Sequence, residues 1–190
     1  MLLWILLVVA AAFFLYLVIT FNSLVRTRQM ANEAWSGIDV QLKRRSDLVP
    51  NLVETVKGYA GHERSVLDEV TRLRGAARAL PDNDVASRAQ AEGALSLALG
   101  KLVALAENYP DLKASSNFLD LQQQLSQLET ELQMARRYYN GTVRNQNVLA
   151  QSFPSNLIAG LFGFGQRQYF EASDGDRAVT QVSLQPGSPA

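Results

Sequence analysis

The chain contains no cysteine and a single histidine among its 190 residues. The absence of cysteine excludes disulfide bonds, thiol catalysis and metal sites built on thiolates, and it fits a reducing compartment. The histidine, His62, lies between Gly61 and Glu63 in a charged, helix-like stretch. We therefore expect His62 to be a solvated surface residue, with no histidine-based catalytic dyad.

Two further sites are missing from the sequence. Di-metal centres in helical bundles use Glu-x-x-His pairs, and no such pair occurs. Gly160, Gly163 and Gly165 follow no strand, precede no Lys-Ser/Thr and are flanked by phenylalanines, so they indicate tight turns or close packing rather than a phosphate loop. We expect no enzymatic activity, no metal, no cofactor and no small-molecule substrate.

The chain has no excess of either charge. Lysine plus arginine and aspartate plus glutamate number 18 each, giving a formal net charge of zero. A basic surplus is the usual requirement for binding nucleic acid, and none is present here. We therefore exclude nucleic acid as a partner.

What the chain does contain is an uncharged amino-terminal run, MLLWILLVVAAAFFLYLVITF, with Thr20 as its one clearly polar residue. At about 1.5 Å per residue this run extends for roughly 30 Å, the thickness of a bilayer's hydrocarbon core. A cleaved secretory signal is the alternative, but the run lacks a basic start, is too long, and is followed by no small-residue cleavage pattern. We predict an uncleaved transmembrane helix over residues 1–21.

Basic residues on one side of the run predict its orientation. Regions rich in lysine and arginine next to a span stay in the cytoplasm, so the amino terminus should lie outside and the remainder inside. Arg26 and Arg28 are close enough to the span to reach lipid phosphates, and we treat both as candidate lipid contacts. The basic residues after the run are Arg26, Arg28, Lys43, Arg44 and Arg45.

Apolar residues recur in steps of four and three from Leu24 to Leu80, the period of a coiled coil or helical bundle. This pattern predicts one long helix that leaves the membrane and bends at Pro50; the alternative is two helices with a turn near Ser46 and Asp47. Only three polar residues interrupt the frame, which are Arg28, Arg45 and Glu63.

Arg45 has two possible environments. If it is buried, it needs an acidic partner such as Glu129 or Glu131. If Pro50 rotates the frame locally, Arg45 instead points to solvent. The sequence leaves both open.

Two more helices follow. The segment 81–84, Pro-Asp-Asn-Asp, predicts a helix that begins near Asn83 or Asp84 and ends at Asn108-Tyr109-Pro110. Capping residues at 115–117 predict a third helix that continues to about Ser152. The residues expected to face inward are Ala91, Leu95, Ala98, Leu102 and Leu105 in the second helix, and Phe118, Leu121, Leu125, Leu128, Leu132, Ala135, Tyr139, Thr142, Gln146 and Leu149 in the third.

The predicted fold is all-α, since no alternating strand pattern is present. The transmembrane helix continues into a mostly antiparallel bundle of three long helices over residues 22–171, with a short helix at its end. The alternative is a four-helix up-and-down bundle with a true turn at Pro50. Residues 172–190 are polar and we expect them to be disordered.

The segment 153–171 is apolar and rich in glycine. It either caps the end of the bundle or forms a contact surface for a partner or the membrane. A turn at Pro50 would return it to the bilayer, whereas a continuous first helix would place it at the far end. The candidate surface residues are Phe153, Leu157, Ile158, Leu161, Phe162, Phe164, Tyr169 and Phe170.

Four stretches of the chain resemble the LemA family of bacterial membrane proteins. They are FNSLVRTRQ at 21–29, AWSGIDVQLKRRSDLVPNLVETVKGYAGHE at 34–63, YPDLKASSNFLDLQQQLSQLETELQMARRYYNGTVRNQN at 109–147 and FPSNLIAGLFGFGQRQYFE at 153–171. The resemblance implies a single-pass inner-membrane protein with its amino terminus outside and a cytoplasmic helical domain. It implies a scaffold role and no enzymatic activity.

The resulting hypothesis is a non-enzymatic, membrane-anchored helical scaffold at the cytoplasmic face of the bacterial inner membrane. Membrane lipid surrounds its anchor, and the protein is expected to form homo-oligomers or to bind other envelope membrane proteins. The alternative is a membrane-remodelling or lipid-binding bundle that uses the apolar segment 153–170.

Overall fold

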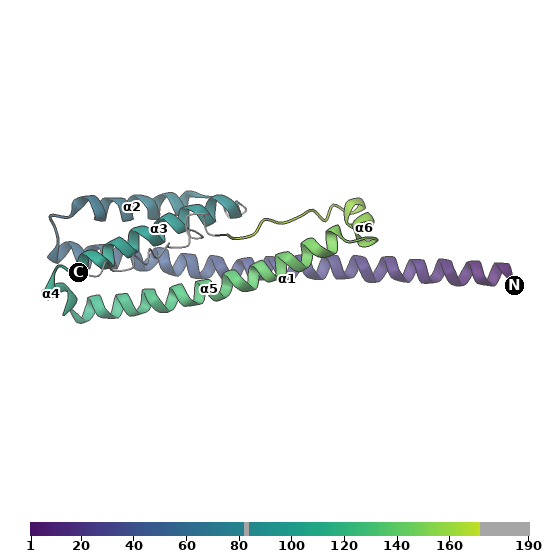
Figure 1. Ribbon diagram of the computed structural model, residues 1–190, viewed down its shortest axis with the longest axis horizontal. Helices are drawn as coiled ribbons and strands as arrows, with labels where there is room; N and C mark the ends of the chain where they lie inside the picture. The colour runs from purple at the N-terminus through teal and green to yellow at the C-terminus, as the bar shows by residue number, and fades with distance from the viewer. Residues whose placement is uncertain (82–83, 172–190) are drawn as a thin grey trace, which may run out of the picture.

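The computed structural model describes residues 1–81 and 84–171, and all regular structure within these ranges is helical, which confirms the predicted class. The four longest helices, α1, α2, α3 and α5, form an up-and-down bundle, and the amino-terminal part of α1 extends beyond it (Figure 1). The helices are α1 (Leu2–Tyr59), α2 (Arg64–Ala79), α3 (Val85–Ala106), α4 (Pro110–Lys113), α5 (Ser116–Gln151) and α6 (Ser155–Leu161).

Helix α1 passes through Pro50 without interruption, so the prediction of a continuous helix is confirmed at this point. Proline lacks the N–H that would donate to the carbonyl of Ser46, four residues earlier. That carbonyl instead accepts a hydrogen bond from Nε of Arg74 in α2, at 2.6 Å. The orphaned backbone group is therefore used to attach α2 to α1.

The first helix ends earlier than the apolar frame predicts. The frame continues to Leu80, but α1 ends at Tyr59 and the chain reverses over residues 60–63 before α2 begins. Glycines at 58 and 61 weaken the helix here. The frame does not reveal the reversal because two of its residues after the reversal, Val70 and Ala77, are still buried.

The other predicted boundaries are close to those observed. Asp84 caps α3 by accepting a hydrogen bond from the backbone N–H of Ser87 at 3.1 Å, while Asn83 lies outside the described residues. Helix α5 ends at Gln151, one residue from the predicted end. The sequence did not predict the single turn of α4, which begins at Pro110.

The reversal after α1 changes where the last helix lies. Helix α5 runs antiparallel to α1, and α6 lies beside residues 17–25 of α1 rather than at the far end (Figure 1). The expectation that a continuous helix at Pro50 would place this segment at the far end is therefore wrong. The extra reversal at 60–63 supplies the fourth helix and returns α5 to the level of residues 17–25.

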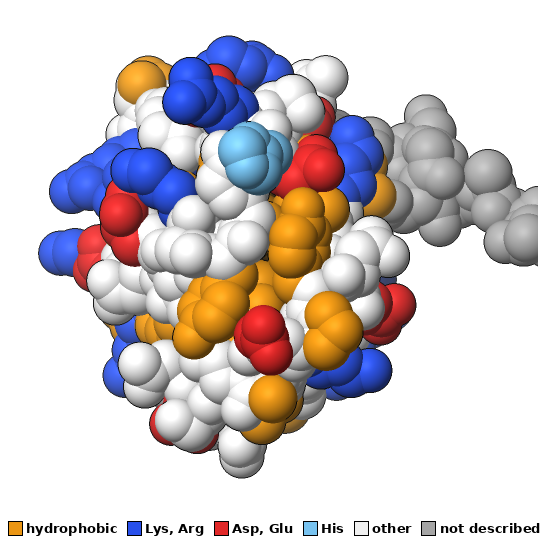
Figure 2. Space-filling view, turned by 90° about the vertical axis from the view of Figure 1, so that its left-hand side faces the viewer, with side chains coloured by type: hydrophobic (Ala, Val, Ile, Leu, Met, Phe, Trp, Pro, Cys, Tyr) orange, Lys and Arg blue, Asp and Glu red, His pale blue; other side chains and the backbone are white. Residues whose placement is uncertain are grey.

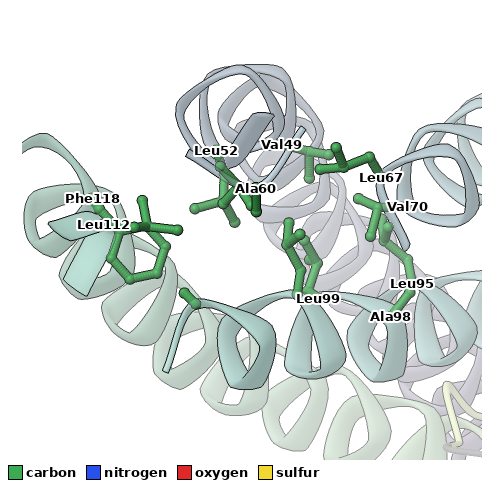
Figure 3. Close-up of a cluster of buried hydrophobic side chains, with 13 residues drawn as sticks. Val49, Leu52, Ala60, Leu67, Val70, Leu95, Ala98, Leu99, Leu112 and Phe118 are labelled. Carbon is green, nitrogen blue, oxygen red and sulfur yellow. The ribbon is translucent and has the colours of Figure 1, made fainter. Parts of the chain in front are cut away.

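The core is divided along the length of the bundle. At the far end, side chains from α1, α2, α3, α4 and α5 converge in one apolar cluster (Figure 3). A second cluster surrounds Ile38, Leu132 and Tyr139 in the middle, and a third lies beneath α6. The surface of the far end is mixed, with basic, acidic and some apolar side chains side by side (Figure 2).

Candidate interaction surface at the end of the bundle

The end of the bundle nearest the amino terminus is built by α6 packing on α1. Ile158 and Ala159 are buried against Leu24, together with Phe164 from the turn that follows α6. Phe21 contacts the rings of Phe162 and Phe164 edge-on, with centroid distances of 4.9 and 5.7 Å. These contacts cover the last turn of the uncharged run of α1.

After α6 the chain turns back as an extended strap, residues 162–171, along α1 and α5 (Figure 1). Gly163 has φ of +71°, a conformation that glycine adopts without a Cβ penalty, and so permits the turn. The N–H of Phe164 donates to the carbonyl of Ala159 at 2.9 Å.

Two asparagines of α5, seven residues apart, hold the strap. The side-chain amide of Asn147 donates to the carbonyl of Arg167 at 3.0 Å and accepts from its N–H at 2.9 Å. Asn140 pairs in the same way with Phe170, at 3.1 and 2.9 Å. Tyr139 donates its hydroxyl to the carbonyl of Gln168 at 3.0 Å, and burial raises the pKa of this phenol, so it stays protonated as a donor.

The structure separates the eight candidate surface residues into three groups by exposure. Ile158, Phe164 and Phe170 are buried within the chain and are unavailable to a partner. Tyr169 is 37% exposed, at the edge of the surface. The most exposed residues are Phe153 at 81%, Leu157 at 65%, Leu161 at 80% and Phe162 at 55%, and we call these four the α6 patch.

The two arginines predicted to contact lipid lie just beyond α6. Arg26 is exposed, whereas Arg28 is partly buried with its guanidinium 4.9 Å from the centroid of the Phe164 ring. A cation over an aromatic face is an attractive contact. Arg28 therefore links α1 to the turn after α6 while remaining partly accessible.

Arg45 is buried, which settles the alternative that the sequence left open. Its guanidinium lies 3.4 Å from a carboxylate oxygen of Glu92 and 3.3 Å from one of Glu129, and it also donates to the hydroxyl of Ser96. Glu129 was one of the two predicted partners. Glu131, the other, instead lies 3.6 Å from Arg44 at the surface.

Glu92 was not predicted as a partner of Arg45, although the sequence contains a signal. Glu92 stands three residues before Leu95 and seven before Leu99, in the frame of α3 that faces inward. Burial raises the pKa of the Glu92 carboxyl, and the charges of Arg45 and Arg88 oppose this shift. The carboxylate thus sits in the core only because cations surround it.

A second surface feature is a groove of about 450 Å³ between α1 and α5. Its polar lining residues are Arg44, Asp47 and Asn51 on one wall and Gln124, Gln127 and Glu131 on the other, and Leu48 and Leu128 complete the lining. Sequence reasoning missed this groove because it depends on the register between two distant helices. Its lining suits hydrogen bonds and ion pairs with another polar surface.

No arrangement typical of catalysis is found in the described ranges. His62 is exposed at the far end of the bundle (Figure 2). Among the described residues, no three His, Asp or Glu side chains lie close enough together to hold a metal ion.

The geometry defines an all-α bundle protein with an apolar amino-terminal helix. Within the described part of the chain, α1 is the one helix long and apolar enough to cross a membrane, and its most apolar 18 residues have a mean hydropathy of 3.0. None of those 18 residues is buried by the bundle.

A sequence model of the LemA family matches residues 34–184, so the chain belongs to the LemA family. It is similar to Magnetosome protein MamQ 2 of Paramagnetospirillum magneticum, with 24% identity over 91% of this chain and 73% of the relative. It is also similar to Protein LemA of Metamycoplasma hominis, with 27% identity over 85% of this chain and 74% of the relative. Family membership and the apolar helix together mark a membrane-associated protein.

Proposed function

We propose that this protein is a non-enzymatic, membrane-anchored interaction module, whose helical bundle lies at the cytoplasmic face of the inner membrane and binds other copies or other envelope membrane proteins. The observation that carries the proposal is the continuity of α1. One helix of 58 residues contains both the apolar run and the α1 side chains that pack in the bundle core.

A continuous helix couples the bundle rigidly to its anchor. Residues 22–59 extend for about 57 Å at about 1.5 Å per residue, so the bundle projects from the membrane as a rigid rod. A rigid rod holds each of its faces at the same distance from the membrane in every copy. This arrangement suits lateral contacts between neighbouring membrane proteins better than it suits capture of a soluble substrate.

The groove between α1 and α5 supports the proposal because it lies on the side of this rod, where a neighbouring membrane protein can reach it. Gln124 and Gln127 are exposed there, and Arg44 and Glu131 supply opposite charges. A surface containing both signs can pair with a second copy of itself as well as with another protein.

Crosslinking in intact membranes tests the proposal. Because the chain has no cysteine, Gln124→Cys gives a single attachment point for a photoreactive maleimide. Ser65→Cys, exposed on α2, is the matched control. We expect discrete higher-mass adducts from the groove position and monomer from the control. Monomer from both positions, or the same smear of adducts from both, would contradict the proposal.

A further inference from the structure

The predicted transmembrane helix and the end of the bundle overlap along α1. The uncharged run continues to Phe21, but Leu17 and Phe21 already pack against α6 and Thr20 is buried, while Val18 and Ile19 on the other side of α1 stay exposed. Residues 17–21 therefore belong both to the run and to the bundle, and they extend for about 8 Å at about 1.5 Å per residue. This overlap requires either that the end of the bundle enters the bilayer or that the bilayer thins around a shorter span.

The end of the bundle is suited to entering the bilayer. Residues 145–166 contain no Asp, Glu, Lys or Arg, although charged residues make up 19% of the chain. One side of α6 packs on Leu17 and Phe21, and the other side carries the exposed α6 patch. The outward apolar side chains thus lie level with the last turn of the uncharged run.

The charges beyond this end have one sign. Residues 2–32 and 140–170 contain no acidic residue. They do contain Arg26, Arg28, Arg144 and Arg167, which we call the arginine band. Arg26 follows Phe21 by five residues, or about 7.5 Å along the helix, which places it near the phosphate layer when Phe21 lies at the edge of the hydrocarbon.

From these observations we infer that the α6 patch is a second membrane contact, inserted into the interface of the same bilayer that α1 spans, with the arginine band against anionic lipid phosphates. The insertion depth of about 8 Å falls within the 5–10 Å typical of interfacial apolar helices. This inference rests on the membrane anchorage in the proposed function, but not on the partner-binding role or on the orientation.

A lipid surface fits the patch better than a second copy of the chain does. If a second copy covered the patch in water, residues 17–21 of the uncharged run would be held out of the hydrocarbon together with the end of the bundle. Insertion of α6 keeps the whole run in the bilayer and covers the patch in a single step. The single sign of the arginine band also suits lipid phosphates better than an identical and equally basic copy.

Depth-dependent quenching tests the inference in the full chain. A fluorophore is attached at Leu161→Cys, and the protein is placed in nanodiscs that hold one copy in phosphatidylcholine and phosphatidylglycerol. Val9→Cys reports on the anchor, and Leu119→Cys, exposed at the far end of α5, reports on water. We expect the probes at 161 and 9 to be quenched by chain-brominated lipid, and the probe at 119 by aqueous iodide.

The outcomes separate the two proposals. If the probe at 9 is quenched by brominated lipid but the probe at 161 is quenched by iodide, α6 lies in water and this inference is overturned while the anchor stands. If neither is quenched by lipid, the anchorage itself fails. Shielding of position 161 from iodide only when two copies share a nanodisc would show that a second copy occupies the patch, and would also overturn the inference.

The arginine band has its own readout. With the probe at 161, brominated phosphatidylglycerol should quench about two-fold more than brominated phosphatidylcholine at equal fractions, because each arginine near the surface favours anionic lipid. Arg26→Gln should reduce this preference. Arg137→Gln, an exposed arginine of α5 outside the band, should leave it unchanged. Equal effects of the two substitutions would mean that net charge, rather than the band, causes the preference.

Discussion

At the scale of single residues, the buried ion pairs of Arg45 are the most unusual feature of the core. The side chain of Arg45 is 2% exposed and that of Glu92 is 8% exposed, whereas Glu129 keeps 34% of its surface in water. Removing one charge of a buried ion pair leaves the other charge buried without a counter-ion. Glu92, not Glu129, is the residue that most depends on Arg45.

We expect Arg45→Leu to lower the free energy of unfolding by about 3–5 kcal/mol, because it removes the buried guanidinium that lies 3.4 Å from the Glu92 carboxylate. Denaturant unfolding of the full chain in detergent micelles measures this loss. The matched control is Arg44→Leu, whose ion pair with Glu131 is exposed and should contribute at most about 1 kcal/mol. The double variant Arg45→Leu with Glu92→Leu should regain most of the lost stability; no recovery would mean that packing rather than charge explains the loss.

The raised pKa of Glu92 predicts an unusual pH dependence. The folded state holds a proton on this carboxyl more tightly than the unfolded state does. Protonation of Glu92 therefore stabilises the fold fully below its ordinary pKa of 4.5, and this stabilisation is lost as the pH rises through the folded pKa. The wild type should therefore gain stability relative to Glu92→Gln as the pH falls from about 7 to about 4. Unfolding curves of both proteins at several pH values measure the difference. A relative loss at low pH would show that Arg45 and Arg88 outweigh burial.

At the scale of helices, Pro50 and Arg74 form a coupled pair. The bond from Arg74 replaces the one that Pro50 cannot make to the carbonyl of Ser46. We expect Arg74→Met to cost about 1.5–3 kcal/mol, the usual range for a hydrogen bond from a charged group. In a Pro50→Ala background, where residue 50 can donate to Ser46 itself, the same substitution should cost clearly less. A double-mutant cycle measures the coupling, and equal costs in both backgrounds would refute it.

The helices show what the sequence could predict and what it could not. The frame of α5 identified buried or partly buried residues throughout, from Phe118 to Leu149, because helical periodicity is a local property. The same frame could not locate the reversal at 60–63. A helix that turns back buries the same stripe as one that continues.

The candidate surface was predictable only in part for a similar reason. The apolar composition of 153–171 marked the segment, and it could not tell the buried Ile158 from the exposed Leu157, which depends on the contact with α1. Asn140 and Asn147 give no local signal, because their partners lie 30 and 20 residues away in a strap without regular structure. Arg45 was visible as a charge in an apolar frame, and its second partner lay in the frame of another helix.

At the scale of the whole molecule, the position of the charges follows from the difference in length between α1 and the bundle. Helix α1 is longer than the bundle, and the other helices pack along it from Leu17 onward (Figure 1). The basic residues nearest to the apolar run, which form the arginine band, therefore all lie on the bundle side of the run. Basic residues next to a span are retained in the cytoplasm.

This asymmetry predicts the topology. In spheroplasts, a membrane-impermeant maleimide should fail to label Ser65→Cys, an exposed position on α2, until the membrane is permeabilised. The same reagent should label Leu2→Cys, at the other end of the span, without permeabilisation. Because the chain has no cysteine of its own, each signal comes from one position. Labelling of residue 65 in sealed spheroplasts would place the bundle outside, where the arginine band would face the outer leaflet and the cytoplasmic interaction role would have to be abandoned.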